Sequence, residues 1–182
     1  VSDALRQLDE LMGDLGHPNA VVPAEGKDFQ QRSWSVRKAC MNVVMSMKGD
    51  RKPVSFIEDC TVPLEHLSEY GARLEDVFRR HGTSGTWYAH ASVGCLHVRP
   101  ILNLKQDQGV KTMRAIAEEA HELVRGFGGT HSGEHGDGMV RSEFLEPMLG
   151  SRLVTAFGEI KSAFDPSGTL YPGKIVNPTR MD

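Results

Sequence analysis

The segment from Lys105 to Gly126 constrains the fold of this chain more than any other. Its apolar side chains recur at the helical period, at Val110, Met113, Ile116, Ala117, Ala120, Leu123 and Val124. Such a stripe has to be buried, so it predicts a long amphipathic helix packed against another element. A similar stripe predicts a second packed helix between Leu64 and Arg80, with Leu67, Tyr70, Leu74, Val77 and Phe78 on its buried face.

Segments with the character of strands lie between and beside these helices. Residues 53–63 alternate in polarity between two prolines, which predicts a strand. Residues 85–102 predict two strands that meet around Gly94, and the Gly-rich residues 128–138 predict a strand or a loop. The order of the elements predicts an α+β fold, in which helices pack mainly on one face of an antiparallel sheet.

The rest of the chain predicts further helices and an irregular end. Helical spacing of apolar residues is expected over 1–15, 29–47, 142–149 and 151–164. We expect a single domain over residues 1–182, with an irregular, turn-rich tail over 165–182.

Composition and charge exclude several classes of function. The formal net charge of −3 gives no general attraction to nucleic acid. The three cysteines, Cys40, Cys60 and Cys95, are widely spaced and form no C-x-x-C pair, which is typical of a reducing cytoplasm. No apolar stretch approaches the length of about 18 residues that a membrane span needs. We therefore expect a cytoplasmic protein without a membrane span, with peripheral attachment at the inner face of the membrane left open.

Two histidines flank the turn of the expected hairpin. If Val93 and Gly94 form a two-residue loop, His90 lies directly opposite His97 on one face of the sheet. Val93 is a poor residue for the positive φ that such a loop demands, and a longer loop would still leave both histidines at the same end of the hairpin. Two imidazoles at this spacing can share one divalent metal ion.

The Gly-rich loop supplies a carboxylate and a further imidazole. Glu134 and His135 lie among five glycines, which allow close approach of the backbone to a ligand and would equally suit a flexible loop. Adjacent residues of an extended segment point to opposite sides, so we expect Glu134 to bind the metal and His135 to face a substrate as a base. Taken singly, each histidine would more often be a hydrogen-bonded structural residue.

Four cationic side chains are candidates for holding an anionic substrate. Arg99 follows His97 by two residues and therefore shares its face of the strand. Arg37 lies on the face of Trp34, Arg141 follows the Gly-rich loop, and Lys52 is a weaker candidate. Arginine binds a carboxylate through two parallel hydrogen bonds and stays charged. The alternative for each of the four is an ordinary surface salt bridge.

Taken together, these motifs resemble the C-terminal domain of the FAD-linked oxidases of the vanillyl-alcohol oxidase type, which include D-lactate, glycolate and D-2-hydroxyglutarate dehydrogenases. The motifs run in order from residue 34 to residue 176. They are Trp34-x-x-Arg37, Asp59-x-x-Val-Pro63, His90-x6-His97, Gly128-Gly-x4-Glu-His-Gly-x-Gly138 and Phe164-Asp-Pro-x-Gly-x-Leu-x-Pro-Gly-Lys174. The segment from Val93 to Pro100 is most similar to the branch that is fused to an iron–sulfur region.

The resemblance implies roles for the candidate residues. It implies that His90, His97 and Glu134 bind zinc or another divalent metal, that His135 is the base, and that Arg37 holds the substrate carboxylate. The sequence departs from the family pattern at Arg99, where the family has Asn. Lys52 aligns only loosely with a family lysine.

The resemblance also implies partners that these residues do not supply. The family's FAD-binding domain precedes this region, and the chain has neither a G-x-G-x-x-G turn nor a P-loop, so we expect no FAD-binding residue here. We expect a ferredoxin-like cap domain, a fragment of a longer flavoenzyme that oxidises a D-2-hydroxy acid and is inactive alone. Iron–sulfur clusters would lie elsewhere, and the electron acceptor is unknown. The alternatives are a metal-dependent hydrolase and a non-catalytic module stabilised by a metal.

Overall fold

The computed structural model describes residues 2–182 and divides the chain into two compact units, Val1–Ser46 and Met47–Asp182. The first unit holds α1 (Ser2–Asp14) and α2 (Lys27–Met45), and neither helix has a buried residue. Both predicted N-terminal helices are therefore confirmed, although Val1 lies outside the described residues. The second unit contains the sheet and is described by itself below.

The sheet of the second unit is built around β4 (Cys95–Leu102). The long neighbour of β4 is β3 (Gly85–His90), and the short strands β1 (Lys52–Pro53) and β2 (Cys60–Thr61) pair with its opposite ends. All three pairings are antiparallel. The predicted α+β fold with an antiparallel sheet is thus confirmed.

The prediction of one continuous strand over residues 53–63 was wrong, because β1 and β2 are separated by a loop. Phe56 and Ile57 are adjacent in this loop and both are fully buried. Neighbouring residues of a strand point to opposite faces, so a regular strand would place one of them away from the core. The loop buries both, and it then delivers Asp59 to the opposite side of the sheet from the helices, where Asp59 contacts residues 132–135.

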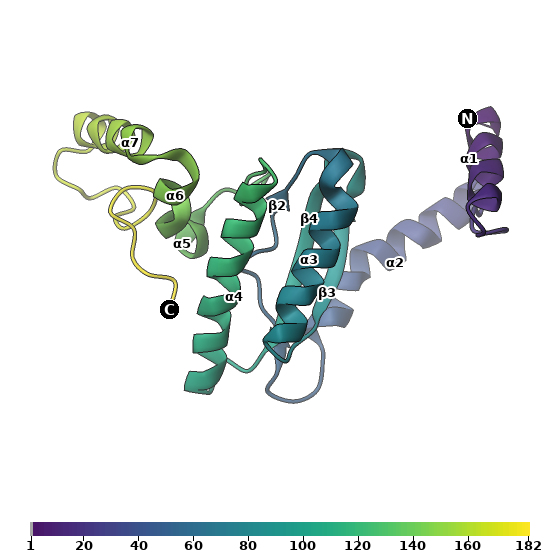
Figure 1. Cartoon of the computed structure of the whole chain (residues 1–182), viewed down its shortest axis with the longest axis horizontal. Coiled ribbons are helices and arrows are strands. Elements are labelled where there is room, and N and C mark those ends of the chain that lie inside the picture. Colours follow the sequence, from purple (N-terminus) through teal and green to yellow (C-terminus); the bar gives the residue numbers. More distant parts are fainter. Residues whose placement is uncertain (1) are drawn as a thin grey trace. The chain divides into compact units, whose positions relative to one another are not determined.

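Two helices cover one face of the sheet, as the apolar stripes predict (Figure 1). They are α3 (Leu67–Arg80), preceded by a short 3₁₀ turn at Leu64–His66, and α4 (Asp107–Gly126). Between them and the strands lies the core, which includes Phe56, Tyr70, Leu74, Phe78, Val98, Ile116 and Val124. Gly85 belongs to this contact, because a Cβ there would lie 2.6 Å from the Phe78 ring. Neither α3 nor α4 packs against the other face of β3 and β4, which we call the helix-free face.

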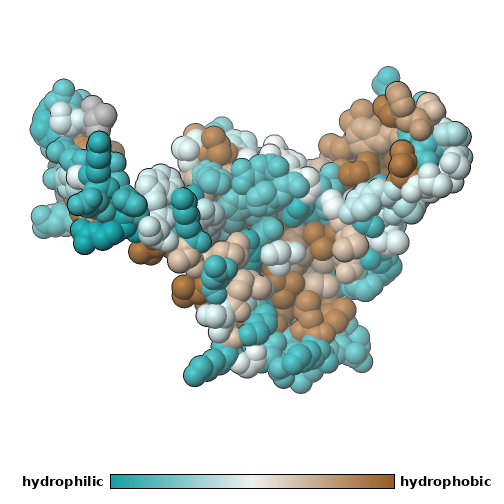
Figure 2. Space-filling model, turned by 180° about the vertical axis from the view of Figure 1, so that it is seen from behind, coloured by the Kyte–Doolittle hydropathy of each residue, from teal (hydrophilic) through white to brown (hydrophobic). Residues whose placement is uncertain are grey.

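The C-terminal third of the chain is a loop followed by short helices. The loop over 128–137 leads into α5 (Gly138–Arg141), a 3₁₀ turn at Ser142–Phe144, α6 (Leu145–Leu149) and α7 (Ser151–Phe164). The α7 helix has no buried residue, and Figure 2 shows its hydrophobic side chains gathered on the surface. The tail after α7 has turns and bends and no further helix or strand.

Membrane crossing by a helix finds no support in the structure. Within residues 2–182, every helix is too short or too polar to span a bilayer.

Candidate active site

The two hairpin histidines lie on the helix-free face of the sheet. Register places Tyr88 opposite His97, and His90 opposite Cys95. The predicted direct pairing of His90 with His97 was therefore wrong, because the connection spans residues 91–94 as a 3₁₀ turn closed by Gly94 in the left-handed conformation. The two histidines are diagonal neighbours instead, and their ring centroids are only 5.1 Å apart. The longer connection thus still brings both rings to one place.

His97 is buried, and its neighbours fix the position of its ring. Its Nδ1 lies 2.7 Å from the backbone carbonyl of Glu58, which can only accept a hydrogen bond, so Nδ1 carries the proton. The unprotonated Nε2 is then free to bind a metal ion. Tyr88 stacks on one side of the ring at 5.3 Å and His135 on the other at 5.0 Å.

The Gly-rich loop is fastened to the sheet by Asp59, which is fully buried. Both Asp59 carboxylate oxygens accept the backbone N–H of Glu134 at 3.1 Å, and one of them also accepts the N–H of His135 at 2.8 Å and the hydroxyl of Ser132 at 3.0 Å. At Gly133 a Cβ would lie 2.1 Å from the Thr61 hydroxyl oxygen. The loop can therefore lie this close to the sheet because Asp59 accepts its N–H groups and because Gly133 has no side chain.

The charge of Asp59 is stabilised by these contacts. Burial alone opposes ionisation of the carboxyl group, but the N–H groups of His135 and Glu134 and the Ser132 hydroxyl outweigh it, so the pKa of Asp59 lies below its ordinary value. An ionised Asp59 therefore holds the loop at neutral pH.

Three imidazoles converge on one carboxylate oxygen. The Oε1 atom of Glu134 lies 3.1 Å from Nε2 of His97, 3.5 Å from Nε2 of His90 and 3.2 Å from Nε2 of His135. Because Nδ1 of His97 carries the proton, the contact between its Nε2 and Glu134 joins two acceptors, and a cation between them would turn a repulsive contact into an attractive one. Two ligands at tetrahedral zinc, each about 2.0–2.1 Å from the ion, would be about 3.3 Å apart. The residues therefore fit a divalent ion.

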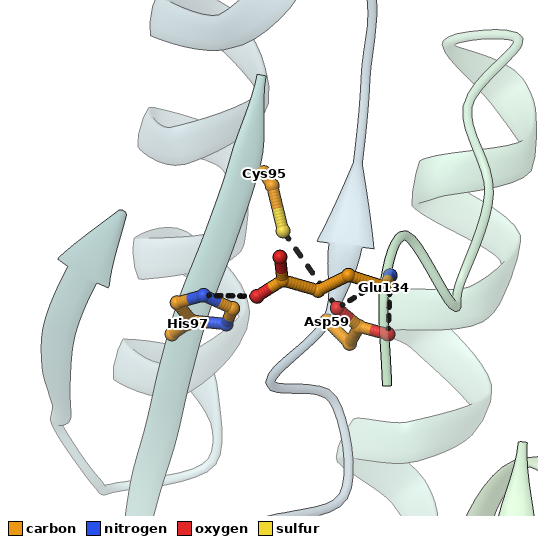
Figure 3. Close-up of side chains that lie close together, drawn as sticks. All are labelled: Asp59, Cys95, His97 and Glu134. Carbon is orange, nitrogen blue, oxygen red and sulfur yellow. Dashed lines mark hydrogen bonds and ion pairs between the residues drawn. The ribbon is translucent and has the colours of Figure 1, made fainter. Parts of the chain in front are cut away.

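Cys95 and Asp59 also lie close to the Glu134 side chain (Figure 3). One ligand atom from each of Asp59, Cys95, His97 and Glu134 lies within 4.8 Å of the others. The Cys95 sulfur is 3.7 Å from Oδ1 of Asp59. Burial, and also the nearby carboxylates of Asp59 and Glu134, raise the pKa of the Cys95 thiol.

Arg99 reaches the helix-free face but is already paired. Its guanidinium lies 2.5 Å from Oε2 of Glu58 and donates to the hydroxyl of Ser55 at 2.8 Å. The other oxygen of Glu58 is 3.8 Å from Nδ1 of His135. Glu58 thus lies between the candidate base and the candidate substrate arginine.

The remaining cationic candidates lie elsewhere. Arg141 is buried and donates hydrogen bonds to the carbonyl of Gly136, so it stabilises the Gly-rich loop. Lys52 pairs with Leu102 at the far end of β4 from His97, and its ammonium donates to the carbonyl of Met47.

Arg37 is on α2 of the first unit, beside the ring of Trp34. A substrate role for Arg37 stays a prediction.

Three residues in or near the candidate metal site had no role in the sequence reasoning: Glu58, Asp59 and Cys95. Asp59 was visible as part of the Asp59-x-x-Val-Pro63 motif, and Cys95 would have been found from a four-residue connection in the hairpin. Glu58 had no signal, because its place depends on the loop between β1 and β2.

Comparison with known proteins bears out the resemblance. A family model described as FAD linked oxidases, C-terminal domain, matches residues 2–175. The chain belongs to this family. Its relatives include D-2-hydroxyglutarate dehydrogenase of Escherichia coli, 36% identical over 84% of this chain, and D-2-hydroxyglutarate dehydrogenase of Pseudomonas putida, 34% identical over 94%. D-lactate dehydrogenase of Archaeoglobus fulgidus is 31% identical over 96% of the chain.

The FAD-linked oxidase domain is a small part of these relatives. The matched region spans 15% of the Escherichia coli protein, 16% of the Pseudomonas putida protein and 37% of the Archaeoglobus fulgidus protein. Family membership therefore concerns this domain, and the activity of a whole protein that contains it is a separate question.

Proposed function

We propose that this chain is the substrate- and metal-binding part of a flavin-dependent dehydrogenase that oxidises a D-2-hydroxy acid to the 2-oxo acid. The convergence of three imidazole Nε2 atoms on Glu134, in a chain of this family, carries the proposal. When bound, a divalent ion held by His90, His97 and Glu134 would lower the pKa of a ligated hydroxyl group, and FAD would accept the hydride.

The position of His135 supports its assignment as the base. Its ring is 41% exposed, stacks on His97 and places Nε2 beside the metal-binding oxygen of Glu134. We assign to Nε2 of His135 the acceptance of the substrate's hydroxyl proton. The resulting imidazolium would face Glu58 and Asp59, whose carboxylate oxygens are each 3.8 Å from Nδ1, and their charge would stabilise it.

Arg99 is the substrate-side cation that the geometry supports within the second unit. It lies on the same strand face as His97, and its guanidinium has donors beyond those used by Glu58 and Ser55. Arg37 stays the proposed partner of a substrate carboxylate, as the family resemblance implies. The contacts of Arg141 and Lys52 give their proposed substrate roles no support, because each is engaged by a backbone carbonyl.

The FAD-binding domain is proposed as a partner within the same polypeptide. The dehydrogenase relatives are several times longer than the matched region, which leaves room for such a domain. Family membership favours this dehydrogenase over a metal-dependent hydrolase or a non-catalytic module. Iron–sulfur clusters and the electron acceptor of the whole protein have no support among these residues.

Rapid mixing of the intact protein with D-2-hydroxy acids tests the proposal by following reduction of the flavin. The variant His135→Gln should slow flavin reduction by about 10²- to 10⁴-fold, the usual contribution of a positioned base. His17→Gln, which changes an exposed histidine of the first unit, is the matched control and should reduce at the normal rate. A His135→Gln rate within threefold of the parent would remove the base assignment, and turnover without flavin would favour the hydrolase.

A further inference from the structure

We propose that Cys95 is a direct ligand of the metal ion, so that the site binds through one thiolate and prefers thiophilic divalent ions such as zinc and cadmium. This inference deepens the proposed function and rests on its metal site.

The position of Cys95 on the sheet brings it to the two histidines. Cys95 precedes His97 by two residues on β4, so both side chains point to the helix-free face, while Leu96 between them is part of the core. In the register of the hairpin, Cys95 lies directly opposite His90. The three side chains therefore share one patch of two adjacent strands.

The Glu134 carboxylate completes this patch. Figure 3 shows it reaching between the Cys95 sulfur and the His97 ring from the opposite loop. Ligand atoms of all three lie within 4.8 Å of one another, which is a distance that small side-chain rotations close around one ion. With His90, the donors then come from two adjacent strands and from one loop that Asp59 holds to the sheet.

Asp59 belongs to the same cluster but has other partners. Its two oxygens accept hydrogen bonds from the N–H groups of Glu134 and His135 and from the Ser132 hydroxyl. Binding a metal through Asp59 would break the contacts that hold Glu134 in place. The hydrogen bonds of the Cys95 thiol, to Asp59 at 3.7 Å and with the Thr61 hydroxyl, are weak because a thiol is a weak donor and acceptor, so its sulfur is the more available ligand.

Charge balance is consistent with a thiolate ligand. Two neutral imidazoles, the Glu134 carboxylate and a Cys95 thiolate together neutralise a divalent ion, which lowers the cost of placing it beside buried residues. On binding, the S–H bond breaks, the sulfur–metal bond forms and the proton leaves to solvent, with no change of oxidation state. A thiolate shifts the preference of the site from magnesium and manganese toward zinc.

X-ray absorption at the zinc edge of the intact, zinc-loaded protein tests this directly, because the method reports neighbours of zinc whatever other cofactors are present. We expect one sulfur neighbour at about 2.3 Å beside nitrogen and oxygen neighbours at about 2.0–2.1 Å. Cys95→Ser should lose the sulfur neighbour and bind zinc at least about tenfold more weakly. Cys40→Ser, which removes an exposed cysteine of α2, should change neither result.

The possible failures are distinguishable. A shell of nitrogen and oxygen alone in the parent protein overturns the role of Cys95, whether or not the variants fold. If that protein still reduces its flavin with a D-2-hydroxy acid, the proposed function stands without it. An intact protein that binds no zinc overturns this inference together with the metal site.

Discussion

Replacing Asp59 with asparagine is expected to loosen the loop that carries Glu134 and His135. The asparagine oxygen can still accept the N–H of His135 and one of the two contacts of the Glu134 N–H, but its NH₂ group would replace the second acceptor of that N–H, and the negative charge would be lost. Loss of one hydrogen bond to a charged group costs about 1.5–3 kcal/mol, and weakening of the others adds about 0.5–1 kcal/mol. We therefore expect local opening of the loop to become easier by about 2–4 kcal/mol.

Hydrogen exchange of residues 128–138 in the intact protein measures this opening. A change of 2–4 kcal/mol corresponds to exchange that is about 30- to 700-fold faster. Ser132→Ala is the matched control, because it removes one donor but leaves the Asp59 charge and its backbone N–H contacts in place, so it should speed exchange less than Asp59→Asn does. If Asp59→Asn exchanges no faster than Ser132→Ala, the loop is held by something other than the Asp59 charge.

The same charge predicts a dependence on acid. Because the pKa of Asp59 is lowered by folding, its stabilising effect is complete above the ordinary carboxyl pKa of about 3.9 and disappears as the pH falls through the lower folded value. Protection of the loop in the parent protein should therefore decline only in acid. The Asp59→Asn variant should lack this decline, and an equal decline in both would contradict the assignment.

Three further outcomes follow from single contacts. Gly94→Ala should lower the melting temperature, with a loss of at least about 2 kcal/mol, because φ is 71° and the new Cβ would lie 2.0 Å from the Val62 carbonyl oxygen; an unchanged melt contradicts this. Burial, assisted by nearby positive charge, lowers the pKa of His121 to about 3, so stability should be full above about pH 6.5 and fall by about 2 kcal/mol at pH 5. In His121→Leu, urea unfolding across this range should lose that slope, and a retained slope assigns it elsewhere. Arg141→Lys should speed hydrogen exchange around Gly136 and leave the KM for substrate within twofold, whereas a KM raised tenfold or more would make Arg141 a substrate residue.

The elements of the second unit followed from periodicity, whereas their connections did not. The stripes of α3 and α4 were visible because a buried helix face repeats at 3.6 residues. The hairpin was placed by Gly94, but its register was not, since the 3₁₀ turn at residues 91–93 adds two residues to the expected connection. The loop between β1 and β2 was read as strand because its buried Phe56 and Ile57 look like strand residues in isolation.

The candidate site likewise contains residues that could be predicted from the sequence and residues that could not. His90, His97, Glu134 and His135 could be named from residue type and spacing, and the structure brings them together. The parts played by Glu58 and Asp59 depend on how a loop packs against a distant loop, which no local pattern encodes, whereas the place of Cys95 depends on the hairpin register. The ion pair between Arg99 and Glu58 could not be predicted from the sequence, because it too depends on the loop that carries Glu58.

The long-range fastening of the site has a consequence for the order in which the protein folds. His97 bonds to a carbonyl 39 residues earlier in the chain, and Asp59 bonds to groups 75 and 76 residues later. Contacts between such distant residues have a large loop-closure entropy and are slow to form, whereas the β3–β4 hairpin joins near neighbours. During synthesis, Asp59 cannot form these hydrogen bonds until the Gly-rich loop has been synthesised. We therefore expect the metal ion to bind late in folding and not to nucleate it.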